Sequence, residues 1–282
     1  MRDVFSARGT RMFVFDSVHE MTEYSDPKHY RNEGGSGFVG MELAKWEKVV
    51  QQAESFWGDG LMVLEEFVTR LEKIEIPLIK HRGRRTHWNE SEGDEFDWER
   101  ARQGEAAWRQ SKREETAGET EITVIIDTTT PYHMDSVDIL WRGAAAIALV
   151  KILEGKGYRV EIGVVNGSYL FSGQHYPVVT ACRLKTPSDP LDASSLINAV
   201  AGWFYRTATF TLLRTLAERN QQTIAGGLGG AYNCTQVDID QITPDDTRIY
   251  STGVFSFSGA CDLMIAELNK IAVDPRQQKS DV

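Results

Sequence analysis

The stretch TVIIDTTTPYHMDS, residues 123–136, holds the side chains with the clearest chemical potential in this sequence. A β-branched run ends in Asp127, and three threonines follow it directly. A carboxylate beside hydroxyl groups offers hard oxygen donors, which Mg²⁺ prefers. The same residues can instead hydrogen-bond to nearby backbone amides and close the strand. The pattern therefore predicts either a metal anchor or a polar strand end, and we favour the interpretation that Asp127 and Thr129 only cap the turn.

A second candidate is a basic segment that could hold nucleic acid. It contains Lys80, Arg82, Arg84, Arg85 and the aromatic Trp88. Arginine holds phosphate groups, and a tryptophan can stack on a base. However, five acidic residues follow between positions 90 and 97, and the whole chain carries a net charge of -10. Because phosphate binding needs a basic surface, a solvated, self-neutralising segment is favoured and nucleic-acid binding is the alternative.

The remaining motifs point to no known chemistry. The three cysteines, Cys182, Cys234 and Cys261, lie far apart, which fits neither a disulfide framework nor a zinc site. The glycine-rich run AGGLGGA at 225–231 is neither a phosphate-binding loop nor a dinucleotide fingerprint, so we expect a mobile loop. No Gly-x-Ser-x-Gly elbow is present, and His133 reads as a solvated loop residue.

Length and composition favour an ordinary globular protein. The chain has 282 residues, of which 41% are hydrophobic and 26% charged. The sequence has no run of 18 apolar residues, so we expect no membrane span. The first residues lack the apolar core of a secretory signal. We therefore expect a cytoplasmic protein that does not bind membranes.

The elements that would position Asp127 follow an α/β pattern. Residues 121–127 form a continuous β-branched run, as in a strand covered on both faces. Asp135 or Ser136 can cap the next helix, whose segment GAAAIALV has no polar residue and must be buried. A second strand follows at 158–165, so the two strands should be parallel. Arg142 is a charged residue near the start of this helix. If it were buried it would need a partner, but a surface position is favoured.

Later segments complete the predicted sheet. Residues 176–184 should pair antiparallel with the preceding strand, because no crossover helix fits between them. Pro177 places that strand at an edge. A long helix follows the capping residue Asp192, then a last strand at 248–257 and a closing helix at 260–271.

The first 118 residues predict a different organisation. Residues 1–35 should have little structure apart from RMFVFD. A helix bearing Leu43 and Trp46 on one face should stop at Gly58-Asp59-Gly60, and a second should end before Pro77. The charged segment 96–115 favours a further helix. We thus expect a poorly ordered segment at 1–35, a helical region at 36–118, an α/β domain at 119–274 and a tail at 275–282.

These elements resemble a von Willebrand factor A-type domain over about residues 122–271. Such domains often carry a metal-ion-dependent adhesion site that begins with Asp-x-Ser-x-Ser. Asp127 and Thr129 match its first two positions, Pro131 replaces the third, and Thr130 lies one residue out of register. The resemblance implies Thr223 as the distant threonine and offers no good distant aspartate, which indicates a degenerate site. The run WRGAAAIALVKILEGKGYRVEI, with GDEFDWERARQGEAAW before it, also resembles an uncharacterised family found largely in phage genomes.

The sequence thus predicts a doubly wound, three-layer, Rossmann-like α/β fold with one antiparallel edge strand, preceded by a helical N-terminal region. The favoured function is a non-enzymatic protein-interaction or assembly module, encoded by a phage and working in the host cytoplasm. We expect a protein partner or a second copy, and the resemblance also suggests an AAA+ ATPase. No cofactor is expected, and Mg²⁺ would bind only at Asp127. The alternatives are a nucleic-acid factor and a metal-dependent hydrolase centred on Asp127.

Overall fold

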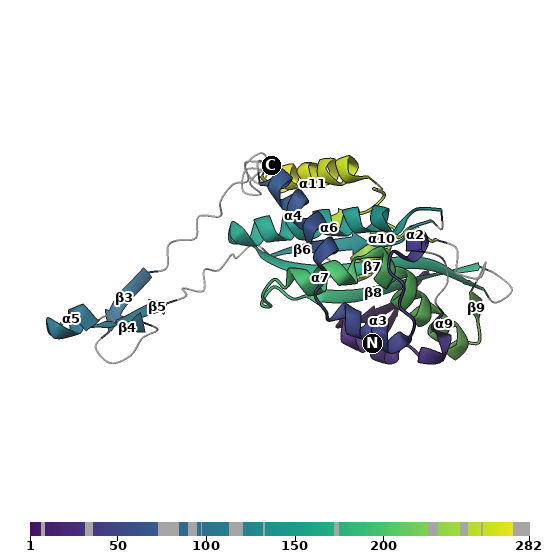
Figure 1. Ribbon diagram of the computed structural model, residues 1–282, viewed down its shortest axis with the longest axis horizontal. Coiled ribbons are helices and arrows are strands. Elements are labelled where there is room, and N and C mark those ends of the chain that lie inside the picture. Colours follow the sequence, from purple (N-terminus) through teal and green to yellow (C-terminus); the bar gives the residue numbers. More distant parts are fainter. Residues whose placement is uncertain are drawn as a thin grey trace.

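A computed structural model describes residues 1–6, 9–31, 36–72, 85–89, 95–96, 98–112, 121–131, 133–171, 175–224, 231–242, 248–254 and 256–272. Its centre is a seven-stranded sheet with the order β1-β2-β8-β7-β6-β10, and β9 pairs with the end of β7 (Figure 1). The strands are β1 (Arg2–Phe5), β2 (Arg11–Phe15), β6 (Glu121–Asp127), β7 (Arg159–Phe171), β8 (His175–Lys185), β9 (Thr223–Ile224) and β10 (Arg248–Ser251).

The sheet is mostly parallel along its centre and is flanked by helices, compatible with a Rossmann-like α/β fold. β6 runs parallel to both β7 and β10, and β2 runs parallel to β8. The predicted parallel pairing of the first two α/β strands is therefore confirmed, as is the antiparallel pairing of β7 with β8. The edge position predicted for β8 is wrong, because β2 pairs with its other side and β1 forms the edge.

The N-terminal segment belongs to this sheet, which differs from the expectation that residues 1–35 have little structure. β2 is largely buried and pairs with β8 from Arg11↔Val178 to Phe15↔Cys182. Helix α1 (Val18–Tyr24) starts at the cap Ser17, whose hydroxyl accepts from the Glu20 amide. The 3₁₀ turn η1 (Pro27–His29) and α2 (Ser36–Val39) follow.

Helix α6 (Ser136–Gly155) explains how the sheet is covered. Its cap is Asp135, as expected, and the Asp135 amide donates to the Asp138 side chain at 3.1 Å. One side of α6 packs on β6, β7 and β10, and the other meets α4 (Gly58–Leu71) and α11 (Phe257–Ala272) (Figure 1). Residues 144–150 are therefore fully buried, which is why the segment needs no polar face.

Further helices complete this face: α3 (Trp46–Ala53), α7 (Ala193–Ala199), α8 (Gly202–Phe204) and α9 (Phe210–Arg219). The opposite face has a smaller core that includes Ile125, Val165 and Cys234. Within the described residues, the helix on that face is α10 (Gln236–Ile242), which contributes Ile239 to it.

Several helix boundaries differ from the sequence-based expectation. Gly58-Asp59-Gly60 forms the first turn of α4 and does not end a helix there. A Cβ at Gly60 would lie 2.4 Å from the Trp57 ring, so glycine permits the chain to turn closely into α4. The long helix expected after Asp192 is interrupted after Ala199. It resumes as α8 at Gly202 and continues through a π-helical turn at Tyr205–Thr209 into α9.

A separate three-stranded sheet has the order β3-β5-β4 (Figure 1). Its strands are β3 (Arg85–Asn89), β4 (Glu95–Phe96) and β5 (Trp108–Lys112), and the short helix α5 covers Trp98–Arg102. The helix predicted over 96–115 is therefore wrong for Trp108–Lys112, which pairs with both other strands. In the described part of the chain, no helix is long and apolar enough to cross a bilayer.

Candidate functional site at the carboxyl edge of the sheet

Asp127 is the last residue of β6, and the sheet topology places it at a position suited to binding. From β6 the chain continues to β7 on one side, and it later returns to β10 on the other side. The carboxyl ends of strands at such a switch point form the ligand crevice of open α/β sheets. Here the two strands meet directly, because the Thr252 hydroxyl, just past β10, donates to Asp127 Oδ2 at 2.9 Å.

The carboxylate of Asp127 is buried and fully engaged by donors of its own chain. Oδ1 accepts from the Thr129 amide at 2.8 Å. Oδ2 accepts from the hydroxyl of Thr252 and from that of Tyr250, at 2.9 and 3.0 Å. Asp127 is only 3% exposed, so these bonds replace the water that an ionised carboxylate needs.

The side chains of the neighbouring threonines also form hydrogen bonds within the chain. Thr129 Oγ1 accepts from the Gly167 amide at 2.7 Å. The Thr130 hydroxyl donates to the Thr128 carbonyl at 3.1 Å. The loop therefore gathers the carboxylate and the two hydroxyls that the sequence singled out, but each of them has a partner within the chain.

Thr223 lies elsewhere. It forms β9, and its hydroxyl donates to the Phe171 carbonyl at 3.2 Å. Phe171 lies six residues farther along β7 than Val165, the register partner of Asp127. At about 3.3 Å per residue, this is roughly 20 Å along the strand. The structure therefore does not bring Thr223 to Asp127.

Arg142 is a residue of this site that sequence reasoning misplaced. It is 1% exposed, so the favoured surface position is wrong. Its Nη1 donates to the carbonyls of Asp127 and Thr129, and its Nη2 lies 3.4 Å from the Thr130 hydroxyl. Burial lowers the pKa of the guanidinium, and the nearby Asp127 charge opposes that effect. The signal was present in the sequence as a single charge in an otherwise apolar helical segment.

A second buried arginine holds the rest of the same loop. Arg206 lies in the π-helical turn, and its Nη2 donates to the Met134 carbonyl at 2.6 Å and towards the Pro131 carbonyl at 3.4 Å. Its Nη1 donates to the Phe38 carbonyl, and its guanidinium lies 3.9 Å from the centroid of the Phe38 ring. Burial lowers the pKa of Arg206. Helical periodicity in the sequence does not reveal a π-helical turn, so the contact of Arg206 with this loop was not predicted.

The other potentially reactive groups nearby are held in neutral form. The Tyr250 hydroxyl also lies 3.3 Å from the Cys234 carbonyl. Burial raises the pKa of Cys234 well above its usual value, and it raises the pKa of Tyr250 as well. A thiol or phenol that keeps its proton at neutral pH is a poor nucleophile, so these residues supply no catalytic nucleophile.

Gly167 allows the segment that carries Tyr232 and Cys234 to pack closely against β7. The Tyr232 amide donates to the Gly167 carbonyl at 3.2 Å. A Cβ at Gly167 would lie only 1.9 Å from the Tyr232 carbonyl oxygen. The residues NGSY continue β7 beyond the strand expected at 158–165, and the glycine allows close packing.

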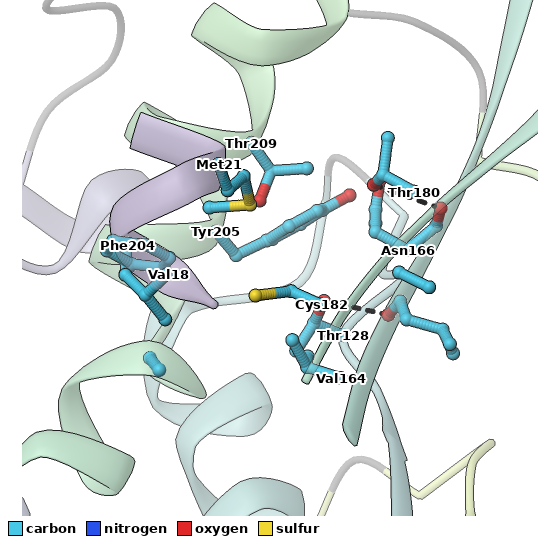
Figure 2. A pocket seen from close by; sticks show the side chains of 13 residues that line it. Val18, Met21, Thr128, Val164, Asn166, Thr180, Cys182, Phe204, Tyr205 and Thr209 are labelled. Atoms are coloured by element: carbon cyan, nitrogen blue, oxygen red, sulfur yellow. Dashed lines mark hydrogen bonds between the residues drawn. The ribbon is translucent and has the colours of Figure 1, made fainter. Parts of the chain in front are cut away.

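A small cavity lies beside β7 and β8 and next to the π-helical turn (Figure 2). Its walls include Thr128, Asn166, Thr180, Cys182 and Tyr205, and the phenol of Tyr205 points towards Asn166. Burial raises the pKa of this phenol. The space accessible to a water-sized sphere is about 10 Å³, which is enough for about one water molecule. It is too small for a substrate.

These observations test whether a Mg²⁺ ion fits the edge. Mg²⁺ needs near-octahedral oxygen donors and usually one or two carboxylates. The described loop supplies one carboxylate, whose oxygens accept three bonds, and the cationic Arg142 lies against the same loop. The residues present do not fit the ion, and no step through a metal follows from them.

The basic segment falls mostly outside the described residues. Lys80, Arg82 and Arg84 are outside them, whereas Arg85 and Trp88 lie on β3. His133 is exposed in the loop after β6.

Comparison with known proteins assigns a family without an activity. A family model described as a domain of unknown function, DUF7192, matches residues 9–269. No curated protein and no solved structure matches the sequence. The matched range includes every strand of the large sheet except β1, together with the Asp127 loop and both buried arginines.

Proposed function

Because the chain belongs to the DUF7192 family, for which no activity is described, we propose a function from its geometry. The protein is a non-enzymatic protein-interaction module of the von Willebrand factor A type. Its metal-ion-dependent adhesion site is degenerate, and an aromatic cluster at the tip of the β7–β8 hairpin makes the contact with the partner. A phage origin and an AAA+ ATPase partner rest on sequence resemblance alone.

The strand arrangement supports the A-type assignment. The order β8-β7-β6-β10 combines parallel strands with one antiparallel hairpin, and α6 connects β6 to β7. β6, which bears the candidate metal anchor, lies between β7 and the edge strand β10. The β1–β2 hairpin departs from it, since it extends the sheet beyond β8.

The aromatic cluster is the observation that carries the proposal. It consists of Tyr169, Phe171, His175 and Tyr232. The ring centroids of Tyr169 and Tyr232 lie 5.4 Å apart, those of Tyr169 and His175 6.0 Å, and those of Phe171 and His175 5.5 Å. Phe171 is 40% exposed. Adjoining, partly exposed aromatic rings are typical of the anchors of protein interfaces.

The position of the cluster fits recognition. β7 and β8 remain paired for six residues beyond the Asp127↔Val165 pair, so the hairpin projects past the carboxyl edge. The Asp127 loop behind it is held by buried arginines and hydroxyl groups. A rigid base beneath a projecting aromatic tip suits binding, because little conformational entropy is lost on association.

A photocrosslinking experiment tests this function. A benzophenone amino acid replaces Phe171 in one variant and Phe56 in a control, and each full chain is expressed at native level in its source cells. Phe56 is 75% exposed but lies between α3 and α4, away from the hairpin. We expect discrete crosslinked proteins, or a crosslinked second copy, from position 171 only. Wild-type protein should compete for this crosslink, whereas a Phe171→Ser/His175→Ser variant should not.

Two outcomes would overturn the proposal. One is the absence of any discrete protein crosslink at position 171. The other is the same crosslinked species from positions 171 and 56, which would indicate non-specific contact.

One observation favours the nucleic-acid alternative. The register of the small sheet places Arg85 opposite Lys112 and Trp88 opposite Arg109, which brings basic and aromatic residue types onto adjacent strands. Retention of DNA or RNA that falls steeply with salt, and that is lost on Arg84→Ala/Arg85→Ala, would support it. Equal retention by the wild type and the variant would reject it.

A further inference from the structure

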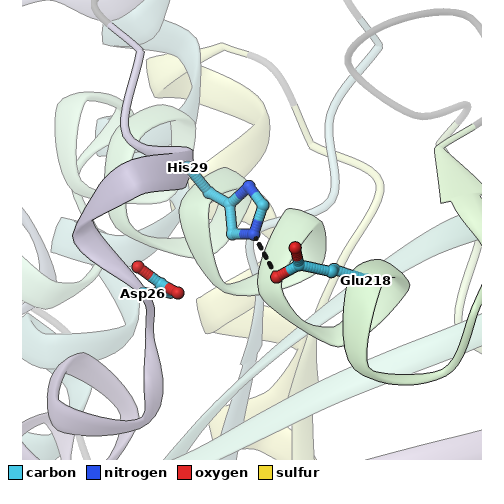
Figure 3. A group of neighbouring side chains, drawn as sticks. All are labelled: Asp26, His29 and Glu218. Carbon is cyan, nitrogen blue, oxygen red and sulfur yellow. Dashed lines mark hydrogen bonds and ion pairs between the residues drawn. The ribbon is translucent and has the colours of Figure 1, made fainter.

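A cluster of metal-ligating side chains lies far along the chain from Asp127 and has no role in the proposed function. Asp26 caps the η1 turn, His29 is the last residue of that turn, and Glu218 lies near the end of α9 (Figure 3). One ligand atom from each residue lies within 4.8 Å of the other two. We propose that these three residues bind a divalent transition-metal ion of the zinc class, which clamps the N-terminal segment to α9.

The donor set selects this class of ion. One imidazole and two carboxylates are ligands of Zn²⁺ and related borderline metals, whereas Mg²⁺ and Ca²⁺ prefer oxygen donors throughout. His29 Nε2 and Glu218 Oε2 lie 3.0 Å apart. Zinc bonds of about 2.0–2.1 Å place tetrahedral ligand atoms about 3.3 Å from one another. This pair is therefore already near the required spacing, and a ligand atom of Asp26 lies within 4.8 Å of both.

A second observation shows that the position attracts a cation. The Lys28 ammonium group lies 2.7 Å from Glu218 Oε2 and 3.1 Å from Asp26 Oδ2. It thus bridges two of the three ligands with a positive charge of the chain itself.

Lys28 is a weak competitor for the site. Its side chain is 55% exposed, and ion pairs at the protein surface are weak. The ammonium group can therefore swing into water when a divalent ion arrives. While no metal is bound, the positive charge of Lys28 neutralises part of the negative charge of the two carboxylates.

The backbone around the ligands is already fixed. The Asp26 amide donates to the hydroxyl of the fully buried Thr215 at 2.9 Å. The His29 carbonyl accepts from Arg214 Nη1 at 3.3 Å. Both contacts join the η1 turn to α9, so the metal would bind to two elements that are held together beforehand, and little ordering is needed.

Calorimetric titration of the full-length chain, without a histidine tag and after removal of metals by a chelator, tests the proposal with Zn²⁺ as the probe. We expect one zinc ion at this site in the wild type and loss of that ion in His29→Ala and Glu218→Gln. Lys28→Met should bind Zn²⁺ more tightly, by up to about fivefold, because it removes the competing charge.

His19→Ala is the matched control. His19 Nε2 lies 3.2 Å from Glu23 Oε1, and both side chains are exposed. Among the described residues this pair has no third ligand within reach. The variant should bind zinc as the wild type does.

A thermal measurement gives a readout that does not depend on counting ions. Saturating Zn²⁺ should raise the Tm of the wild type and of Lys28→Met but not that of His29→Ala, because a ligand that binds only the folded state stabilises it. Equal zinc affinity in the wild type and His29→Ala would overturn the proposal. So would a Lys28→Met affinity no higher than that of the wild type.

Discussion

Replacing Asp127 by asparagine should lower the free energy of unfolding by about 2–3 kcal/mol. The carboxylate accepts three hydrogen bonds, from the Thr129 amide, the Tyr250 hydroxyl and the Thr252 hydroxyl. A hydrogen bond to a charged group contributes about 1.5–3 kcal/mol and a neutral one about 0.5–1.5 kcal/mol. Asparagine keeps the shape but removes the charge, and its amide nitrogen cannot accept a hydrogen bond. The bonds to its remaining oxygen therefore weaken by about 1 kcal/mol each, and at least one former donor loses its acceptor. The nearby Arg142 also loses a favourable charge.

A true metal ligand would behave in the opposite way. Carboxylates gathered for a cation repel one another when the cation is absent, so neutralising one of them would cost little or would stabilise the protein. Mg²⁺ at ten times its dissociation constant would then stabilise the wild type by about 1.4 kcal/mol. For a domain of this size, the Tm would rise by about 4 °C.

Urea unfolding followed by tryptophan fluorescence distinguishes the two cases when it is run in chelator and in 10 mM Mg²⁺. We expect Asp127→Asn to be destabilised equally in both buffers, and wild-type stability to be the same in both. Asp16→Asn is the control, because the Asp16 side chain is 63% exposed and its carboxylate lies 3.7 Å from Arg183. It should shift stability by no more than about 0.5 kcal/mol. A neutral effect of Asp127→Asn in chelator, together with a Mg²⁺-dependent rise in the free energy of unfolding of the wild type, would refute the reasoning.

Three further substitutions test the same region. Gly167→Ala should lower the free energy of unfolding by more than about 3 kcal/mol, because its Cβ would lie 1.9 Å from the Tyr232 carbonyl oxygen. Gly155→Ala is the control: nothing lies within 4 Å of its Cβ, so the free energy of unfolding should stay the same or rise by up to about 1 kcal/mol. Equal urea midpoints for the two variants would contradict this prediction. Arg142→Met should lower the unfolding free energy by about 3 kcal/mol by leaving buried carbonyls without a donor, and Arg142→Lys should recover only part of it. Burial alone would raise the pKa of Asp238, but hydrogen bonds to its carboxylate lower the pKa overall; the resulting stability is present above about pH 4 and is lost as the pH falls through the folded-state pKa. The difference in free energy of unfolding between Asp238→Asn and the wild type should therefore become smaller from pH 6 to pH 2.5. A difference that stays constant over this range would contradict the prediction.

The central βαβ unit could be predicted because local patterns determine it. The β-branched run before Asp127 and the helical segment with no polar residue each allow essentially one environment. The short connections between them then leave one handedness and one relative direction. The capping residue Asp135 was predictable for the same reason, since its position relative to the apolar segment is a local signal.

Features that depend on distant partners could not be predicted in this way. β2 was visible as an apolar run, but its place in the sheet depends on β8, more than 160 residues later. The strand Trp108–Lys112 is too polar to show alternation, and it forms by pairing with β3 and β4. The π-helical turn that places Arg206 on the Asp127 loop has no sequence signature of its own.

The candidate site shows the same division between local and distant determinants. The sequence correctly grouped Asp127 with Thr129 and Thr130, which are neighbours in one loop, but it placed Thr223 with them only by resemblance. It could not show that the loop carbonyls would be satisfied by two guanidinium groups from separate helical segments. Those arginines fix the loop without an ion, so the carboxylate needs only neutral hydroxyl and amide donors. The Asp127 carboxylate already accepts three hydrogen bonds from its own chain, which supports the proposal that the aromatic side chains of the β7–β8 hairpin make the contact with a partner.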